Sequence, residues 1–197
     1  LKPLPSSENV SRASRRRRVP LPGRHQAWNA ATAVEALRAL DGECGLPVMD
    51  AHIVAGIAGA ALPMRQEVFC TKPVVLLDGA HNLDKLTALA DTMREHLAGR
   101  RTVAVMGMLR DKDYGPSIAL IAGLCHSFIA CAPHSDRALP SATAAAIARE
   151  SCADVRIIDD VDLAVSQALE LAGGEGAVVV CGSFYLAGPA REYFGNQ

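Results

Sequence analysis

The chain has 197 residues, of which 50% are hydrophobic and 4% aromatic, so its core must be built from Ala, Val, Leu and Ile. A formal net charge of −1 excludes attachment to nucleic acid through an overall basic field. No stretch approaches the roughly 18 uninterrupted apolar residues of a membrane span, and the six cysteines show neither a C-x-x-C pair nor zinc spacing. We therefore expect a reduced, cytoplasmic protein. Because the first residue is Leu1, we also expect it to be part of a longer one.

The first 61 residues predict a linker followed by two helices. Residues 1–25 lack periodicity, and their Arg15–Arg18 run is typical of a solvated segment. Apolar residues at helical spacing then predict a helix over Gln26–Leu40 and a second helix over Val48–Ala61. The glycines at positions 42 and 45 are expected to end the first of them.

Short Val- and Ile-rich segments alternate with helical segments over the rest of the chain. This alternation is typical of a parallel sheet covered by helices on both faces, with right-handed crossovers. We therefore expect an α/β fold. The expected strands are Gln66–Phe69, Val74–Leu77, Val103–Met106, Ser127–Cys131, Val155–Ile158 and Ala177–Cys181, and the expected helices are Leu83–Leu97, Tyr114–Leu124, Ser141–Glu150, Val161–Leu171 and Tyr185–Phe194.

Polar residues follow several of the expected strands, at the edge where α/β sheets bind ligands. The most informative string is Asp78-Gly79-Ala80-His81-Asn82, which leads from a strand into a helix whose amino end would favour an anion. There is no Gly-Lys-Ser/Thr and no G-x-G-x-x-G after a strand, so a nucleotide bound here would have its phosphates held elsewhere. The other polar loops are Gly107–Asp113, Ala132–Asp136, Asp159–Asp160 and Gly182–Tyr185.

Each of these residues also has a purely structural interpretation. Asp78 and Asn82 could cap the following helix, and Ser183 could cap the last one. His81 could be a hydrogen-bonded turn residue, and Arg110–Asp113 could be a solvated turn with ion pairs. The residues alone leave these alternatives open.

Four segments, taken in order, resemble the C-terminal portion of folylpolyglutamate synthase and of the bifunctional dihydrofolate synthase/folylpolyglutamate synthase, in the Mur ligase superfamily. They are Pro22-Gly23-Arg24-His25-Gln26 with Asn29-Ala30-Ala31, then Asp78–Asn82, then Gly107–Asp113, then Gly182–Gly188. The resemblance implies a Rossmann-like, mostly parallel sheet. It further implies that residues 1–61 are the tail of a central ATPase domain, 62–72 an interdomain hinge, and 73–197 the Mur ligase C-terminal domain.

The same resemblance implies a ligase that joins L-glutamate to a folate carboxylate through an acyl phosphate made from ATP. Its P-loop and Mg²⁺ ligands would lie in an N-terminal domain outside this chain, against which the chain would pack, and the isolated fragment would be inactive. Folate and L-glutamate are then the expected partners, with no nucleic acid and no membrane, and a monomer is expected.

The resemblance assigns roles to four residues. Asn29, Arg65 and Asp78 match residues that contact ATP, and the resemblance implies that Asp78 does so through the ribose hydroxyls. His81 matches a histidine near the reacting phosphate or the incoming glutamate, and the sequence does not choose between a protonated and a neutral role for it. The family usually has Pro-Gly-Arg followed by an aromatic and an acid, whereas this chain has Met64 in place of that glycine. Because a bulky residue disfavours positive φ, we expect Met64 not to adopt it comfortably.

Two other functions remain open at this point. One is a stand-alone α/β module that binds an anion or regulates a partner. The other is a fragment of a cell-wall Mur ligase acting on a nucleotide-sugar peptide, although the Asp-Gly-Ala-His-Asn form favours the folate branch.

Overall fold

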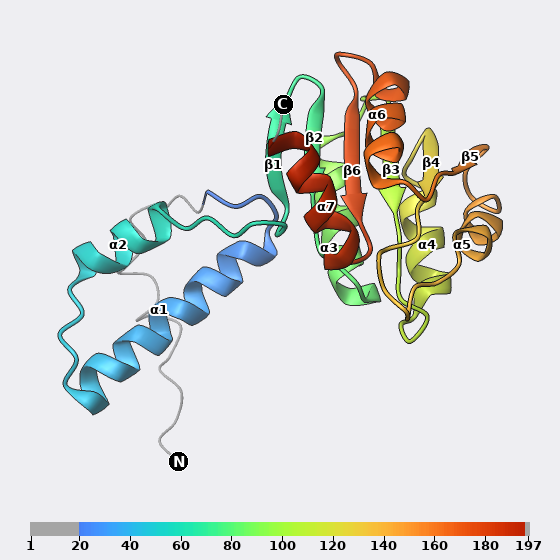
Figure 1. Ribbon diagram of the computed structural model, residues 1–197. Coiled ribbons are helices and arrows are strands. Elements are labelled where there is room, and N and C mark those ends of the chain that lie inside the picture. The colour runs from blue at the N-terminus through green and yellow to red at the C-terminus, as the bar shows by residue number, and fades with distance from the viewer. Residues whose placement is uncertain (1–19, 196–197) are drawn as a thin grey trace. The chain divides into compact units, whose positions relative to one another are not determined.

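The computed structural model describes residues 20–195, so the Arg15–Arg18 run lies outside the described residues (Figure 1). The chain divides into two units, with the boundary between Ala61 and Leu62. The first unit contains helices α1 (His25–Cys44) and α2 (Asp50–Ala58). The prediction that Gly42 helps to end the first helix is wrong, because Gly42 lies inside α1. Gly45 ends it in the left-handed conformation, with φ at 66°.

The two helices of the first unit bury few side chains. Within them the buried residues are Gln26, Val34 and Ile53. Trp28 is 78% exposed. Other large apolar side chains of this unit are exposed as well: Leu37, Leu40, Leu46, Met49 and Val54. By itself, the described part of this unit has little hydrophobic core.

The second unit is built on a six-stranded sheet with the order β1-β2-β6-β3-β4-β5 (Figure 1). The strands are β1 (Glu67–Thr71), β2 (Val74–Leu77), β3 (Thr102–Met106), β4 (Ser127–Ala130), β5 (Asp154–Ile157) and β6 (Ala177–Cys181). All neighbouring pairs are parallel except β1 and β2. The prediction of a mostly parallel α/β fold is confirmed.

Strict alternation of strand and helix fails at the first two strands. β1 and β2 are antiparallel and are joined by only Lys72 and Pro73, a link too short for a crossover helix. Residues 62–72, which the resemblance assigns to a hinge, therefore include one strand of the sheet.

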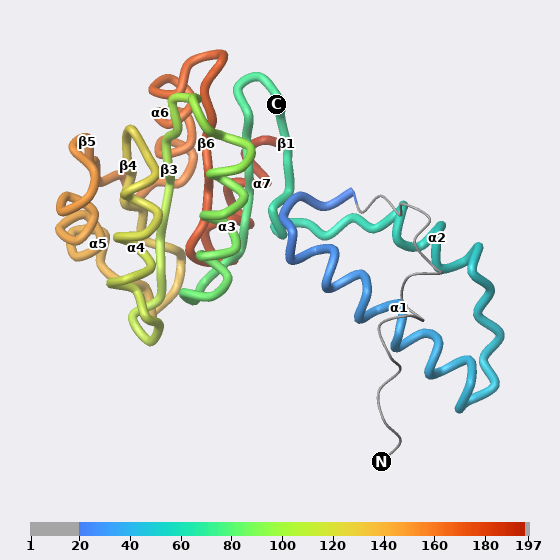
Figure 2. The backbone as a smooth tube through the Cα atoms, turned by 180° about the vertical axis from the view of Figure 1, so that it is seen from behind, coloured from blue at the N-terminus to red at the C-terminus, as the bar shows by residue number. Residues whose placement is uncertain are grey.

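Helices cover both faces of this sheet. One face carries α3 (Leu83–His96), α4 (Tyr114–Ala122) and α5 (Ser141–Ala148), and the other carries α6 (Val161–Ala172) and α7 (Phe184–Gly195) (Figures 1 and 2). Each face has its own buried cluster, one around Leu86, Ile118 and Phe128 and the other around Val165, Val180 and Leu186. Because both faces are covered, β3 and β6 are apolar at nearly every position and buried throughout.

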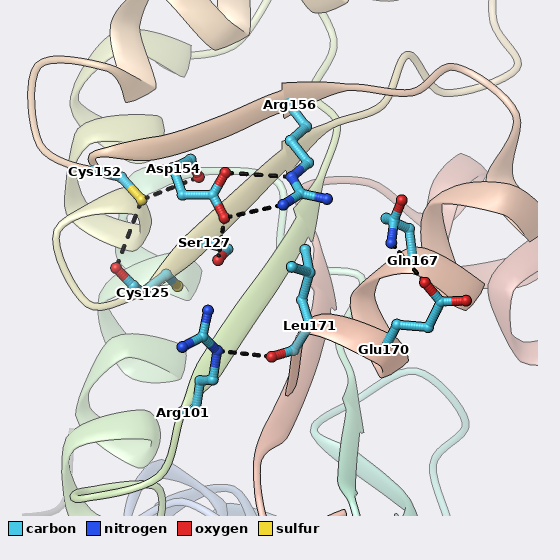
Figure 3. Close-up of polar contacts among 9 residues, drawn as sticks. All are labelled: Arg101, Cys125, Ser127, Cys152, Asp154, Arg156, Gln167, Glu170 and Leu171. Atoms are coloured by element: carbon cyan, nitrogen blue, oxygen red, sulfur yellow. Dashed lines mark hydrogen bonds and ion pairs between the residues drawn. The ribbon is translucent and has the colours of Figure 1, made fainter. Parts of the chain in front are cut away.

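The edge strand β5 pairs with β4 in parallel, and a polar cluster lies near the amino ends of these two strands (Figure 3). Ser127 Oγ donates to Asp154 Oδ2 at 2.7 Å, and Arg156 Nε lies 3.3 Å from Asp154 Oδ1. The Ser127 hydrogen bond is the main reason that the pKa of Asp154 is lowered. The polar atoms of these side chains are hydrogen-bonded to one another, so a structural role at the paired strands is enough to explain the cluster. None of the helices within residues 20–195 is long and apolar enough to cross a membrane.

Candidate functional site

The candidate site lies where β2, β6 and β3 end side by side. The last strand, β6, is inserted between β2 and β3, so the chain order reverses here, which is where open α/β sheets bind ligands. Backbone hydrogen bonds continue past the strands, from the Asp78 N–H to Val180 O at 2.9 Å and from the Gly107 N–H to Cys181 O at 3.2 Å. The three loops after these strands therefore start from fixed positions.

Asp78 is the first residue after β2, and only 5% of it is exposed. Its Oδ1 accepts the Ala80 N–H at 2.8 Å, which closes a local turn. Burial raises the pKa of Asp78 to about 6, against the opposing effects of the Ala80 hydrogen bond, the Arg65 charge, the Gln66 side chain and the Lys85 charge. A carboxyl group with such a pKa is mostly ionised at neutral pH, but its ionised form is destabilised by burial.

The turn before β1 places Arg65 beside this loop. Met64 and Gln66 both have left-handed backbone, with φ at 56° and 51°. The expectation that Met64 would avoid this conformation is wrong. Two hydrogen bonds hold it there: the Met64 N–H donates to Glu67 Oε2 at 2.9 Å, and Met64 O accepts the Gly79 N–H at 2.8 Å. Met64 therefore adopts the left-handed conformation that the glycine of the family pattern would adopt more easily.

Phe184, the first residue of α7, lies between two of the predicted site residues. The Arg65 Cζ atom is 5.0 Å from the centre of the Phe184 ring, within cation–π range, and the His81 ring centre is 5.9 Å from it. A Cβ atom on Gly79 would fall 2.2 Å from Phe184 Cε1, so position 79 has room only for glycine. The ring thus joins the loop after β6 to the loop after β2.

His81 has a partner at each ring nitrogen. Nδ1 lies 2.8 Å from Gly79 O, and Nε2 lies 3.1 Å from Lys85 Nζ. A carbonyl oxygen only accepts and an ammonium only donates, so both contacts are satisfied together when Nδ1 carries the proton and Nε2 accepts. This geometry favours a neutral imidazole whose accepting nitrogen faces a cation.

The structural interpretations of the strand-end residues hold for some of them. Asn82 caps α3, because its Oδ1 accepts the Lys85 N–H at 3.0 Å, whereas Asp78 forms its own turn and does not cap the helix. Ser183 Oγ accepts the Tyr185 N–H at 3.1 Å, near the start of α7. In the charged loop, Asp111 pairs with Lys112 and with Arg137, each at 3.3 Å and near the surface.

The structure brings three of the four predicted site residues together. Arg65, Asp78 and His81 gather around Gly79 and Phe184. Asn29 belongs to the other unit, where it is exposed on α1 and donates from Nδ2 to Gln26 Oε1 at 3.0 Å.

Sequence reasoning missed Gln66, Lys85 and Phe184. Lys85 follows His81 by four residues across the start of α3, a spacing that could have indicated contact. Phe184 lies within the Gly182–Gly188 segment that the sequence analysis singled out, but it was given no role. Gln66 gave no comparable signal, because its contacts join distant parts of the chain. Among residues 20–195 there is no group of three or more His, Cys, Asp or Glu side chains that could hold a metal ion.

The family model described as "Mur ligase, glutamate ligase domain" matches residues 64–184, which is more than half of the chain and includes Arg65, Asp78 and His81. The chain belongs to the Mur ligase family. The matched range begins within the turn that carries Arg65 and ends at Phe184, so it spans the whole candidate site of this Mur ligase domain.

The curated relatives that this Mur ligase domain matches are named as folylpolyglutamate synthases or dihydrofolate synthases. The chain is 35% identical over 164 residues to dihydrofolate synthase/folylpolyglutamate synthase of Escherichia coli, covering 83% of this chain and 37% of that protein. The Mycobacterium tuberculosis folylpolyglutamate synthase complexed with ADP superposes with a TM-score of 0.80 at 31% identity, over 92% of this chain and 42% of that one. A bifunctional folylpolyglutamate synthase/dihydrofolate synthase with Mn, AMPPNP and L-glutamate bound superposes with a TM-score of 0.75 at 30% identity, over 90% of this chain and 41% of that one. The chain spans only 20–44% of the length of the curated relatives that it matches.

Proposed function

We propose that this chain is the C-terminal part of an ATP-dependent ligase that adds L-glutamate to folate through an acyl phosphate. The observation that carries the proposal is the cluster of Arg65, Asp78 and His81 at the switch point of a Mur ligase domain. Its relatives are named for folylpolyglutamate and dihydrofolate synthesis, and solved ones hold ADP or AMPPNP with L-glutamate. We propose that the chain forms one wall of a nucleotide site and that polypeptide outside it forms the other wall.

The polar groups suit a nucleotide in their chemistry. An ionised Asp78 accepts hydrogen bonds, as a carboxylate that binds ribose hydroxyls must. Since Asp78 is 5% exposed, a nucleotide would reach only its remaining open edge. Arg65 and Lys85 add two positive charges that act on Asp78 from nearby, which suits a polyphosphate. Asn29, exposed on α1, is the residue that we propose reaches the nucleotide from the first unit.

His81 is proposed to act near the incoming L-glutamate. In the tautomer that its two contacts favour, Nε2 is an acceptor, which can orient an amine and take up a proton as the amide forms. Lys85 supplies the neighbouring positive charge, so the imidazole itself need not be protonated to steady a phosphate. ATP would supply the activated phosphoryl group, and the residues of this chain would bind and orient the reactants.

The site does not fit a Mg²⁺ ion by itself. Mg²⁺ requires several oxygen ligands in octahedral geometry, whereas Asp78 is the one carboxylate among the residues gathered here and faces two cations. We therefore propose that the P-loop and the Mg²⁺ ligands lie in polypeptide outside this chain, as the resemblance implies.

The first unit is proposed to be the tail of the ATPase domain that supplies them. Trp28 and the other exposed apolar side chains of α1 and α2 fit helices that pack against more of such a domain. In this proposal residues 62–72 connect the two domains, residues 73–197 are the Mur ligase C-terminal domain, and the complete protein is a cytoplasmic monomer.

The first test compares the chain with a complete enzyme. The genomic reading frame upstream of Leu1 should encode a P-loop. The 197 residues alone should neither hydrolyse ATP nor form glutamyl amides, and the complete polypeptide should do both. A stop codon just before Leu1, or robust turnover by the 197 residues alone, would overturn the division of labour.

The second test addresses the site. In the complete enzyme Asp78→Ala should lower turnover by a factor on the order of 100, as loss of a preorganised charged contact often does. Asp84→Ala is the matched control, because Asp84 is an exposed carboxylate in the first turn of α3. Unchanged kinetics for Asp78→Ala would show that Asp78 has only a structural role in its local turn.

A further inference from the structure

Gln66 lies opposite Asp78 at the end of the β1–β2 hairpin. In the β1–β2 hairpin Glu67 pairs with Leu77, so the antiparallel register places residue 66 opposite residue 78. Beyond the strands the Gly79 N–H donates to Met64 O, one residue out of this register, so the two segments remain side by side. The left-handed backbone of Gln66, with φ at 51°, accompanies a side chain that is directed inward, since only 1% of the residue is exposed.

Two neighbours determine the orientation of the Gln66 amide: the Thr92 hydroxyl on α3 and the Asp78 carboxylate. Thr92 Oγ1 lies 2.9 Å from Gln66 Oε1 and 3.1 Å from Ala88 O, so its single proton can serve either oxygen. If the amide were turned over, Gln66 Oε1 would face the Asp78 carboxylate, and two acceptors would meet in a buried place. With Oε1 on the Thr92 hydroxyl, the NH₂ group is left for Asp78.

We propose that Gln66 is a positioning residue for the Asp78 carboxylate and that Thr92 holds the Gln66 amide in place. The effect on catalysis rests on the proposed nucleotide-binding role of Asp78, whereas the effect on the carboxylate does not. Gln66 stands where the family pattern has an aromatic residue, so this contact belongs to the particular chain.

Gln66 acts on Asp78 in a different way from the charged groups around it. Arg65 from the turn before β1 and Lys85 from α3 act on the carboxylate as charges, and the thiol of Cys181 at the end of β6 is close enough to be affected by it. The side-chain hydrogen bond from Gln66 lowers the pKa of Asp78 together with the Ala80 N–H. Gln66 carries no charge, so replacing it changes the hydrogen bond and leaves the charges around Asp78 in place.

The experiment is a titration of the Asp78 side-chain carbon by NMR in the 197-residue chain. Gln66→Met keeps the length and volume but removes the amide, and the pKa of Asp78 should rise by about one unit because its charged form loses a hydrogen bond. Thr92→Val should raise it by a smaller amount. Thr87→Val is the matched control, since the Thr87 hydroxyl bonds to Leu83 O on the exposed side of the same helix, and it should leave the pKa unchanged.

An unchanged Asp78 pKa in Gln66→Met, or equal shifts in Thr92→Val and Thr87→Val, would overturn the proposal. If Gln66→Met does not fold, the two threonine variants still decide it. In the complete enzyme, Gln66→Met should move the acid limb of the pH profile of kcat/KM for ATP upward by the same amount. If Gln66→Met shifts the pKa of Asp78 but leaves the pH profile of kcat/KM unchanged, the positioning role of Gln66 stands. The proposed nucleotide-binding role of Asp78 is then refuted.

Discussion

Replacing Asp78 by Asn is expected to stabilise the folded chain at neutral pH. Burial raises the pKa of Asp78 from its ordinary 3.8 to about 6. A carboxyl group with the higher pKa in the folded state binds its proton more tightly there, so stability falls as the pH rises through the interval between the two values. A difference of about two units corresponds to about 3 kcal/mol of unfolding free energy lost above about pH 7.

Asparagine removes the charge and keeps both the size and an acceptor oxygen for the Ala80 N–H. That hydrogen bond becomes a neutral one and is weaker than the bond to a carboxylate. The expected net gain is therefore about 1–3 kcal/mol at about pH 7.5. It should shrink by about 2 kcal/mol at about pH 4.5, where the native Asp78 is itself protonated in the folded state.

Urea unfolding of the 197-residue chain, followed by circular dichroism at both pH values, measures this effect. Asp84→Asn is the matched control, because it removes an exposed carboxylate from the first turn of α3 and should cost a few tenths of a kcal/mol, about the value of one helix-dipole interaction. The reasoning fails if Asp78→Asn is the less stable chain at about pH 7.5, or if its advantage is the same at both pH values.

Three further predictions concern the same loops. Met64→Gly should be more stable than Met64→Ala by about 1 kcal/mol, the reverse of the usual order, because position 64 has positive φ; urea midpoints for the two variants test this, and a more stable alanine variant would contradict it. Gly79→Ala should lose about 1–3 kcal/mol through its clash with the Phe184 ring, whereas Gly115→Ala, which meets nothing within 4 Å, should not; a double-mutant cycle with Phe184→Leu should recover part of the loss, and strict additivity would argue against the clash. His81→Ala in the complete enzyme should slow amide formation more than acyl-phosphate formation, which single-turnover kinetics can separate, and an unimpaired amide step would remove His81 from catalysis.

Much of the fold follows from local patterns. The apolar runs Val74–Leu77 and Ala177–Cys181 lie at the predicted positions, because a strand covered on both faces must be apolar throughout. A strand was predicted at Gln66–Phe69, close to the observed β1, but its antiparallel pairing with β2 was not predicted, because this strand lies in the segment assigned to a hinge. The end of α1 was misplaced because Gly42 lacks the left-handed conformation that Gly45 has.

The candidate site was predictable only where it is local. Asp78 and His81 are found by their place after a strand, and Asn82 is a cap as one interpretation had it. The contacts of Arg65 with Phe184 and of Gln66 with Thr92 join residues that are far apart in sequence, so they depend on the hairpin register and on the position of α7. The positive φ of Met64 could not be read from its type, because hydrogen bonds from neighbouring segments hold it.

The most direct test of the proposed nucleotide wall is a crystal structure of the complete polypeptide with ADP bound. We predict that the ribose or phosphates contact the Asp78 carboxylate and the Arg65 guanidinium, with Asn29 at the same nucleotide. A nucleotide that touches none of the three, with Asp78 closed beneath its neighbours, would contradict the proposal.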